Sequence, residues 1–495
     1  MILRETYSLC PECYKKIPAK VVAKNGKVFL QKECPEHGFY EELYYGDLEI
    51  YKRFESFDDE PKNKLENPNF DKENTKNECP FNCGLCYRHK SHTALANVVV
   101  TNRCNLKCWY CFFYAEKVGY VYEPTLEEFK KMAEMLKNQR PVACNAIQLT
   151  GGEPTLREDL AEIVKIFKEA NFEHIQLNTT GIKLAEDLEL CKKLSDAGVT
   201  TLYVSFDGVT PKTNPKNHFA IPKLIENCRK SNIGIVLVPT VIKTVNDHEL
   251  GDIIKFGFEN LPIVKGVNFQ PVSLVGRMPK EEREKYRITI PDALKLIEEQ
   301  TSGAILVEDF YPIPAMLCFT RLIDAITGFK HYELGSHFAC GAATYVFRDE
   351  KSKKLVPITR FVDVDAMIEF FSEFYKEIEK EKNIGKAIAI GKAVAKLKSF
   401  IDFSKMPSQL KLDKVLAAVL EERSYKALGR FHDQALFIGM MHFMDTYNYD
   451  VQRVQRCCIH YVTPDMRVIP FCTFNVMPHL YRDKIHEKYG KPLEK

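Results

Sequence analysis

The chain has 495 residues, of which 45% are hydrophobic and 28% charged, and this composition of a globular protein excludes a disordered or fibrous one. With 70 Lys and Arg against 67 Asp and Glu, the net charge of +3 gives no support to nucleic-acid binding through bulk electrostatics. No apolar run reaches the roughly 20 residues of a membrane span, and the first residues lack the layout of a secretory signal. We therefore expect a cytoplasmic protein with no nucleic-acid partner.

The 17 cysteines are unevenly distributed, and nine of them fall before residue 112. An odd number in a chain without an export signal argues against a disulfide framework. Most of the nine lie two to four residues apart, as metal ligands on short loops must, whereas structural cysteines would be scattered. The early cysteines are therefore predicted to bind metal.

Residues 1–60 are predicted to form a ribbon-like metal-binding module. A C-x2-C pair, Cys10 and Cys13, is followed after alternating apolar stretches by a C-x2-H pair, Cys34 and His37. Three thiolates and an imidazole suit a tetrahedral mononuclear site for zinc or for a rubredoxin-like iron. The alternative is a small apolar core that contains buried cysteines.

From residue 95 the pattern changes to short apolar runs that alternate with helical patterns. After a first run at 98–100, later runs centre on Ile147, Ile175, Tyr203, Ile235 and Val267. Strand–helix repeats of about 30 residues imply an α/β fold with a parallel sheet and right-handed crossovers. The repeats over 95–279 suit a partial (β/α)6 barrel of the TIM type, with its chemistry at the carboxyl ends of the strands.

Residues 280–495 are predicted to form a mixed, helix-rich domain that holds an auxiliary cluster and the substrate. Helical periodicity is found around 367–382, and a hairpin-like stretch at 454–475 closes the domain. Apolar stripes at helical spacing occupy 387–394 and 435–444. Core packing is the simpler interpretation of these stripes, and a tunnel for a long hydrocarbon chain near a membrane surface is the alternative.

The strongest chemical signal is the loop after the first barrel strand, which carries Cys104, Cys108 and Cys111. Cysteines at this spacing can ligate three irons of a [4Fe–4S] cluster and leave the fourth iron open. A partial zinc knuckle, the alternative, would need a fourth ligand such as His89. The C-x3-C-x2-C motif with an aromatic residue, Tyr110, before its last cysteine resembles the radical S-adenosylmethionine (SAM) superfamily.

Later strand ends support this resemblance. The sequence Gly-Gly-Glu-Pro at 151–154 is similar to the family's SAM-binding loop, and the segments 178–181 and 205–208 are similar to its other SAM contacts. The resemblance implies a 5′-deoxyadenosyl radical, made from SAM, that takes hydrogen from an unactivated carbon. The residues that it assigns to SAM are Tyr110, Thr150, Gly151, Gly152, Glu153, Asn178, Thr180, Ser205 and Asp207.

Two further cysteine sets are predicted to hold auxiliary clusters, which makes three [4Fe–4S] clusters with the SAM cluster. One set lies in 61–94, which we interpret as a linker and an auxiliary-cluster segment, and consists of Cys79, Cys83 and Cys86. The other set is dispersed along the chain, although its last three members bracket a hairpin: Cys340, Cys457, Cys458 and Cys472, with Cys318 as a further candidate. Cys144, Cys191 and Cys228 are interpreted as packed core residues.

The order of these motifs over nearly the full length resembles one archaeal group of radical SAM enzymes, the tetraether lipid synthases, also described as methylases of a pterin precursor. This resemblance implies an archaeal diether phospholipid substrate, whose terminal methyl carbons are joined by a C–C bond to give macrocyclic archaeol and the glycerol dialkyl glycerol tetraether (GDGT). It also implies a low-potential electron donor such as ferredoxin and peripheral contact with the inner face of the membrane.

The alternative is a methyltransferase that acts on 7,8-dihydro-6-hydroxymethylpterin in methanopterin biosynthesis, with a folate-type methylene donor. A small polar substrate needs carboxylates and amides in its pocket, and Asp309, Asp363 or Asp365 could supply a carboxylate. The sequence identifies no residue that transfers protons in either reaction.

Overall fold

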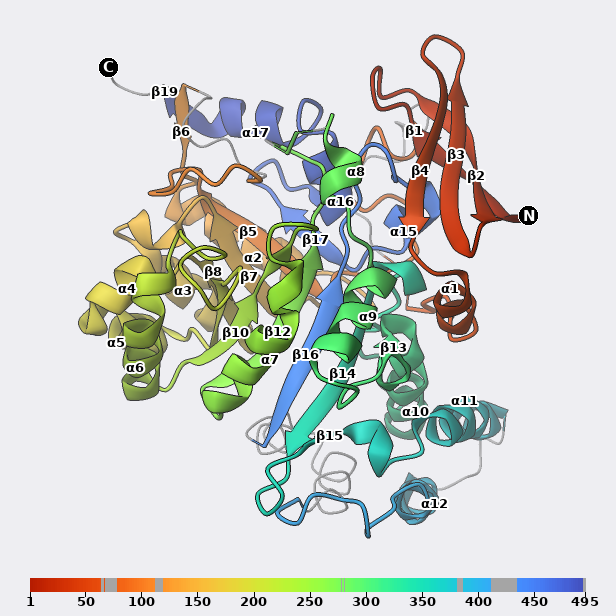
Figure 1. Ribbon diagram of the computed structural model, residues 1–495. Coiled ribbons are helices and arrows are strands. Elements are labelled where there is room, and N and C mark those ends of the chain that lie inside the picture. Colours follow the sequence, from red (N-terminus) through yellow and green to blue (C-terminus); the bar gives the residue numbers. More distant parts are fainter. Residues whose placement is uncertain are drawn as a thin grey trace.

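The structure, a computed structural model, describes residues 1–63, 66, 78–111, 119–276, 278–279, 281–380, 386–410 and 434–492 (Figure 1). Most of the expected linker, 64–65 and 67–77, lies outside the described residues. The end of the helical pattern predicted around 367–382 also lies outside them, because 381–385 are not described. None of the described helices is both long and apolar enough to cross a membrane.

The amino-terminal residues form a separate antiparallel sheet in the order β1–β2–β3–β4, which is the expected ribbon: β1 (Ile2–Leu9), β2 (Lys16–Lys24), β3 (Lys27–Cys34) and β4 (Gly38–Tyr45). In such a meander the β1–β2 and β3–β4 turns lie at the same end of the sheet. One turn carries Cys10 and Cys13 and the other Cys34 and His37, so four residues distant in sequence are brought together. Helix α1 (Leu48–Glu55) follows, capped by the carboxylate of Asp47.

Six parallel strands in the predicted order form the centre of the main sheet, which confirms the partial barrel: β5 (Leu95–Thr101), β7 (Ala146–Gly151), β8 (His174–Thr179), β9 (Thr201–Ser205), β10 (Gly234–Val238) and β12 (Val264–Pro271). Strands buried on both faces read as continuous β-branched and apolar runs, and the 98–100 run is one of them. A short strand, β11 (Thr240–Val241), pairs with the end of β12.

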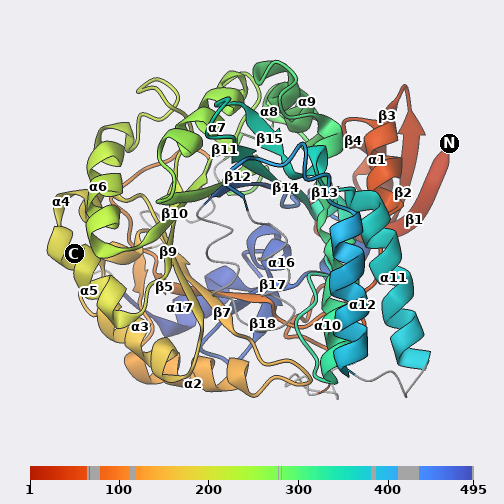
Figure 2. The same cartoon turned by 90° about the horizontal axis from the view of Figure 1, so that it is seen from below.

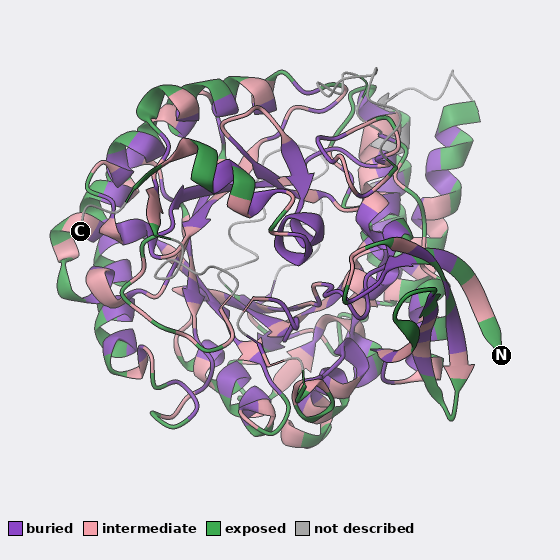
Figure 3. Ribbon diagram, turned by 90° about the horizontal axis from the view of Figure 1, so that it is seen from above, coloured by how far each residue is buried: buried purple, intermediate pink, exposed green. Residues whose placement is uncertain are grey.

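Helices connect these strands and cover the outside of the sheet: α2 (Leu126–Lys137), α3 (Leu160–Glu169), α4 (Ile182–Glu186), α5 (Leu188–Ala197), α6 (Ile221–Ser231) and α7 (Leu250–Glu259). Figure 2 shows them as a ring around the strands, and Figure 3 shows their buried faces turned toward the sheet. The amphipathic spacing of α3 produces this arrangement, because its Leu160, Ile163, Val164 and Phe167 are all buried.

The carboxyl-terminal half extends the barrel sheet at both edges. At one edge β16 (Ala435–Met441) pairs parallel with β12, and the antiparallel β14 (Gly341–Arg348) follows it, flanked by the short β13 (Tyr311–Pro312) and β15 (Leu355–Pro357). At the other edge β17 (Ile459–Val462) pairs parallel with β5 and antiparallel with β18 (Val468–Pro470). These strands therefore belong to the same sheet as the barrel strands. The domain boundaries expected from the sequence stay a prediction.

The expectation of a helical stripe at 435–444 is wrong, because this segment contains the strand β16. Leu436, Ile438 and Met440 are buried in the main hydrophobic core. A continuous apolar run of this length fits a strand buried on both faces as well as a helix, and tertiary pairing decides between them.

The remaining helices belong to the carboxyl-terminal half: α8 (Arg283–Tyr286), α9 (Ile290–Gln300), α10 (Leu317–Thr327), α11 (Val364–Lys380), α12 (Lys386–Ser399), α15 (Val451–Gln455), α16 (Phe471–Val476) and α17 (Arg482–Tyr489). Helices α10, α11 and α12 lie side by side over a second core (Figure 2). All residues of α16 are buried, and this helix lies inside the ring of strands in the view of Figure 2. A two-stranded pair, β6 (Tyr120–Tyr122) with β19 (Gly490–Pro492), lies near the carboxyl terminus.

Two buried carboxylates of the segment before α15 hold the ribbon on the barrel. Asp450 pairs with Arg4 and accepts hydrogen bonds from Thr6 Oγ1 at 2.8 Å and Tyr44 Oη at 2.9 Å, all three donors being ribbon residues. Although burial opposes ionisation, Arg4 and Thr6 hold the pKa of Asp450 well below its usual range. The ribbon is therefore docked through a charged contact whose carboxylate is fully buried.

The second carboxylate, Asp445, acts through a bridging guanidinium. Arg287 lies with Nη2 3.0 Å from Asp445 and with Nε 2.6 Å from Glu42 on strand β4. All three side chains are buried, so the bridge connects the ribbon to the barrel with little competition from water.

We predict that Asp450→Asn loosens the ribbon. Asparagine retains the shape and the cap of α15, but it leaves Arg4 without its partner, and breaking a buried ion pair costs about 3–5 kcal/mol. Amide hydrogen exchange should show protection of β1 falling by at least about a hundredfold. Because the pKa of Asp450 is depressed in the folded state, its stabilisation is fully present above the unfolded pKa, near 3.9, and is lost as the pH falls below that value. The stability of the Asp450→Asn variant should lack this pH-dependent contribution.

The control is Glu49→Gln at an exposed pair with Lys52, which should change stability by less than about 1 kcal/mol. Equal protection of β1 in the Asp450→Asn variant and in the unmodified protein would contradict the docking role of this carboxylate.

Candidate active site

The loop that begins at the end of β7 lies directly against the backbone that leads into the predicted SAM-cluster cysteines. Gly152 N donates to Thr101 O at 2.9 Å, and Glu153 N donates to Arg103 O at 2.7 Å. A Cβ atom on Gly152 would lie 2.1 Å from Arg103 O, and Gly151 has φ +142°. Only glycine permits this approach, so the Gly-Gly pair fixes the start of the cysteine loop.

The side chain of Glu153 connects the ends of β7 and β8. It is 1% exposed and accepts hydrogen bonds from Thr155 N at 3.1 Å, Thr155 Oγ1 at 2.6 Å, Thr179 Oγ1 at 2.7 Å and Thr180 N at 2.7 Å. Such a number of donors holds a carboxylate in one orientation. Its direct role toward SAM stays a prediction.

Tyr110, between Cys108 and Cys111, is tied to the end of β9. Its hydroxyl donates to the carboxylate of Asp207, and Lys216 Nζ lies 2.7 Å from that hydroxyl and 2.6 Å from the same carboxylate. Burial, and then the Asp207 charge, raise the pKa of Tyr110 well above its ordinary value, so the phenol remains a donor. This cluster holds the cysteine loop against the barrel.

Sequence analysis missed two polar residues of this region, Lys216 and Asn217. Lys216 is only 8% exposed, and Asn217 Nδ2 donates to Thr180 O at 2.6 Å and to Ser205 O at 2.7 Å. Both lie in the loop that follows the predicted strand-end segment 205–208. A charged and an amide side chain at the carboxyl end of a barrel strand are the signal that could have identified them.

The other residues predicted to contact SAM also lie at the carboxyl ends of the strands. Asn178 Nδ2 donates to Thr150 Oγ1 at 3.3 Å, which connects the ends of β8 and β7. The hydroxyl of Thr180 is buried and has no hydrogen-bond partner within the described part of the chain. A buried polar atom of this kind fits a ligand at the strand ends, and the residues present are therefore compatible with SAM.

The three thiols of the predicted SAM cluster lie on the half-exposed loop beside this end of the barrel. Burial raises the pKa of Cys104 to about 12, and Glu153, Cys111 and Cys108 add to this shift. The three thiols are not all within 4.8 Å of one another, as ligands of a single ion would be, and this spacing is compatible with a cluster in which each thiolate binds a different iron.

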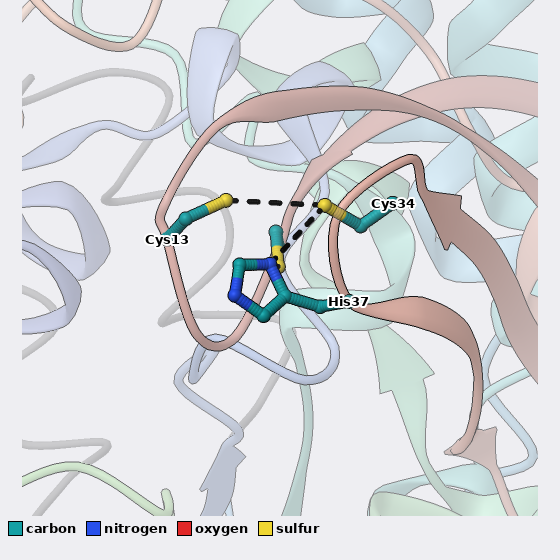
Figure 4. Close-up of side chains that lie close together, drawn as sticks. Cys13, Cys34 and His37 are labelled. Atoms are coloured by element: carbon teal, nitrogen blue, oxygen red, sulfur yellow. Dashed lines mark hydrogen bonds between the residues drawn. The ribbon is translucent and has the colours of Figure 1, made fainter.

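The ribbon brings its four predicted ligands together at one end (Figure 4). The ligand atoms of Cys10, Cys13, Cys34 and His37 all lie within 4.8 Å of one another. Cys13 Sγ is 3.9 Å from Cys34 Sγ, and His37 Nδ1 is 3.5 Å from Cys34 Sγ and 3.7 Å from Cys10 Sγ. This geometry suits a single tetrahedral ion, either zinc or iron.

Both predicted auxiliary sets also converge, although the clusters themselves stay a prediction. Cys79, Cys83 and Cys86 line one small pocket. In the dispersed set, burial raises the pKa of Cys457 well above its ordinary value, and the neighbouring Cys472, Cys458 and Cys340 raise it further.

Arg453 is the buried cation of the dispersed set. It is 2% exposed and donates to His442 O at 2.9 Å. Although burial opposes its charge, Cys340, Tyr44 and Cys472 raise the pKa of Arg453, which is suited to offset the thiolates.

The four remaining cysteines are core residues. Cys144, Cys191 and Cys228 are buried in the main core, as expected. Cys318 does not join the dispersed set, because it packs in the second core and donates to Ala315 O at 3.4 Å.

The carboxylates considered for a pterin pocket are engaged locally. Asp309 pairs with Arg360 at 2.8 Å and accepts from Thr359, Asp365 accepts from Tyr311 at 3.0 Å, and Asp363 bonds Ala366 N at 3.1 Å. None of these contacts places Asp309, Asp363 or Asp365 at the carboxyl ends of β7, β8 or β9.

Comparisons with known proteins agree with this geometry. Residues 98–257 match the model of the radical SAM superfamily, and residues 2–46 match the "HMPTM N-terminal zinc ribbon domain". The barrel and the cysteine loop therefore define a radical SAM enzyme with a zinc-ribbon module.

The chain belongs to the family of the 7,8-dihydro-6-hydroxymethylpterin dimethyltransferase of Methanocaldococcus jannaschii, to which it is 46% identical over 99% of its length and 96% of that protein. A probable GTP 3′,8-cyclase of the same organism is 30% identical over 42% of this chain and 67% of the cyclase. Among solved structures, a radical SAM methyltransferase from Sphaerobacter thermophilus is 14% identical to this chain. The match covers 62% of this chain and 75% of that protein, with a TM-score of 0.34.

These relatives overturn the expectation of a tetraether lipid synthase and of a diether phospholipid partner. The full-length relative is named for a pterin substrate and for methyl transfer. The structure removes one physical reason for the lipid interpretation, since the apolar stripe at 435–444 contains a core strand of the sheet.

We predict that Gly152→Ala weakens SAM binding at least about tenfold, equivalent to about 1.4 kcal/mol. The added Cβ would overlap Arg103 O and displace the loop that leads to Cys104. Equilibrium dialysis on the anaerobically reconstituted protein measures this. The matched control is Gly391→Ala on α12, where the added Cβ meets nothing within 4 Å and the helix should gain up to about 1 kcal/mol. Unchanged SAM affinity in Gly152→Ala would contradict the proposed constraint.

We predict that the ribbon retains one zinc ion per chain and that His37→Ala releases it, whereas His37→Cys, which leaves the ion with four thiolate ligands, keeps it. Zinc analysis after gel filtration measures the stoichiometry. His248→Ala, at an exposed histidine, is the control and should leave the zinc content unchanged. Full zinc retention in His37→Ala would exclude His37 as a ligand.

Proposed function

We propose that this protein is a radical SAM methyltransferase that acts on 7,8-dihydro-6-hydroxymethylpterin, or on a pterin of that class, in methanopterin biosynthesis. The observation that carries this proposal is the 46% identity to a dimethyltransferase of that substrate along nearly the whole of both chains. The strand-end geometry supports it, because it suits a radical SAM reaction.

Under this proposal Cys104, Cys108 and Cys111 hold a [4Fe–4S] cluster, and SAM lies at the carboxyl ends of β7, β8 and β9. When bound, the cluster and SAM supply a 5′-deoxyadenosyl radical that abstracts hydrogen from carbon. A low-potential donor such as ferredoxin provides the electron, and a folate-type methylene donor supplies the transferred carbon. The two auxiliary cysteine sets hold further clusters.

The chain's own residues position these groups. Gly151 and Gly152 set the distance between the β7 loop and the cysteine loop, and Glu153 fixes the β7 end to the β8 end. Lys216 places a buried positive charge beside Asp207, where it can bind the carboxylate of SAM. Residues 280–495 are proposed to supply the substrate pocket.

The test is an anaerobic assay of the reconstituted protein with SAM, a folate-type methylene donor as the source of the transferred carbon, and a low-potential reductant. Mass spectrometry follows 5′-deoxyadenosine and product masses in separate reactions with 7,8-dihydro-6-hydroxymethylpterin, with archaeal diether phospholipid, and with no substrate. We expect pterin-dependent 5′-deoxyadenosine and a pterin that has gained one or two methyl groups. An unchanged pterin, or turnover of the lipid alone, would overturn the proposal.

Two lysine variants test the positioning within the same assay. Lys216→Met should raise the KM for SAM at least about tenfold, because it leaves Asp207 and Tyr110 without their cation. The control, Lys223→Met, removes an exposed lysine at the start of α6 and should leave the kinetics unchanged.

A further inference from the structure

The pocket lined by Cys79, Cys83 and Cys86 contains a fourth residue with metal-binding chemistry. His89 follows Cys86 by three positions, its amide donates to Cys86 O at 2.9 Å, and its side chain lines the same pocket. The pattern is therefore C-x3-C-x2-C-x2-H, and all four residues line the pocket.

The hydrogen bonds of His89 assign its tautomer. Nε2 lies 2.7 Å from Cys457 O, and Ser91 Oγ donates to the same carbonyl at 2.8 Å. A carbonyl oxygen only accepts, so Nε2 carries the proton, and in a neutral imidazole the lone pair is then on Nδ1. A metal-binding histidine typically donates its other N–H to a backbone carbonyl or a carboxylate, as His89 does here.

A second buried histidine supports this orientation. His460 Nε2 lies 3.1 Å from His89 Nε2, and His460 is 0% exposed. The Nε2 side of the His89 ring is therefore occupied by two polar groups, the carbonyl of Cys457 and the imidazole of His460.

The spacing of the pocket cysteines differs from that of a single-ion site and is compatible with a cluster. In the described part of the chain only the ribbon brings its ligand atoms within 4.8 Å of one another. The pocket cysteines are spread more widely, as expected where each ligand binds a different metal atom of a cluster.

We propose that His89 is the fourth protein ligand, through Nδ1, of an iron–sulfur cluster held by Cys79, Cys83 and Cys86. A neutral imidazole in place of a thiolate reduces the negative charge at the iron, so this cluster has a more positive potential than one with four cysteines. The same imidazole is hydrogen-bonded to the carbonyl of Cys457, a member of the dispersed set, and thereby connects the two auxiliary sites. The proposal does not depend on which substrate the enzyme uses.

Pulsed EPR tests this assignment without any substrate. The full chain carrying Cys104→Ala, Cys108→Ala and Cys111→Ala lacks the SAM cluster, and its ribbon is loaded with zinc, which is silent in EPR. The protein is labelled with 15N-histidine, reconstituted with iron and sulfide, and reduced. We expect a hyperfine coupling from one directly bound histidine nitrogen on a cluster signal.

The variants attribute that coupling to one residue. His89→Ala should abolish it, and His89→Cys should abolish it while keeping the iron content and shifting the midpoint potential to a more negative value. His92→Ala, at a neighbouring buried histidine that accepts from Glu333 N at 2.8 Å, should retain the coupling. Absence of the coupling in the parent, or its persistence in His89→Cys, would overturn the proposal, even if His89→Ala fails to fold.

Discussion

The parallel pairing of β17 with β5 determines where the two predicted auxiliary cysteine sets meet. Ile459 pairs with Leu95, and the backbone amides of Ala94 and Leu95 donate to the carbonyl of Cys458. Because the two strands are parallel, the segments that precede them also run side by side. The pocket cysteines before β5 are thereby brought next to Cys457 and Cys458, although more than 350 residues separate the two segments. Two cysteines of the dispersed set are therefore neighbours of the pocket cysteines.

Buried charge is concentrated where the separate parts of the chain meet. The segment Asp445–Asp450 binds the ribbon through ion pairs with Arg4 and Arg287. Arg453 follows a few residues later and interacts with the thiols of Cys340 and Cys472. A buried ion pair is costly to break, so this segment connects the position of the ribbon to that of the dispersed cysteine set. A cluster bound by that set would add negative charge, which Arg453 is placed to offset.

The SAM end of the barrel depends instead on backbone approach and on hydrogen-bonded side chains. Two glycines allow the β7 loop to bond the segment before Cys104, and Tyr110 with Asp207 and Lys216 fixes the other end of the cysteine loop. The loop itself is short and half exposed, so it needs both attachments to present three thiols to one cluster. The polar side chains collected at these strand ends suit a charged cofactor.

The sequence by itself determined what depends on local spacing: the cysteine motifs, the Gly-Gly-Glu loop and the strand–helix repeat of the barrel. A metal loop or a βα unit is defined by neighbours a few residues apart, so its pattern is readable along the chain. Only the tertiary structure decided that 435–441 is a strand, that Cys318 lies apart from the dispersed cysteines, and that Lys216 and His89 face their sites. Those facts depend on pairing between residues far apart in sequence, and the choice of substrate needed comparison with a full-length relative because a shared motif order does not specify what enters the pocket.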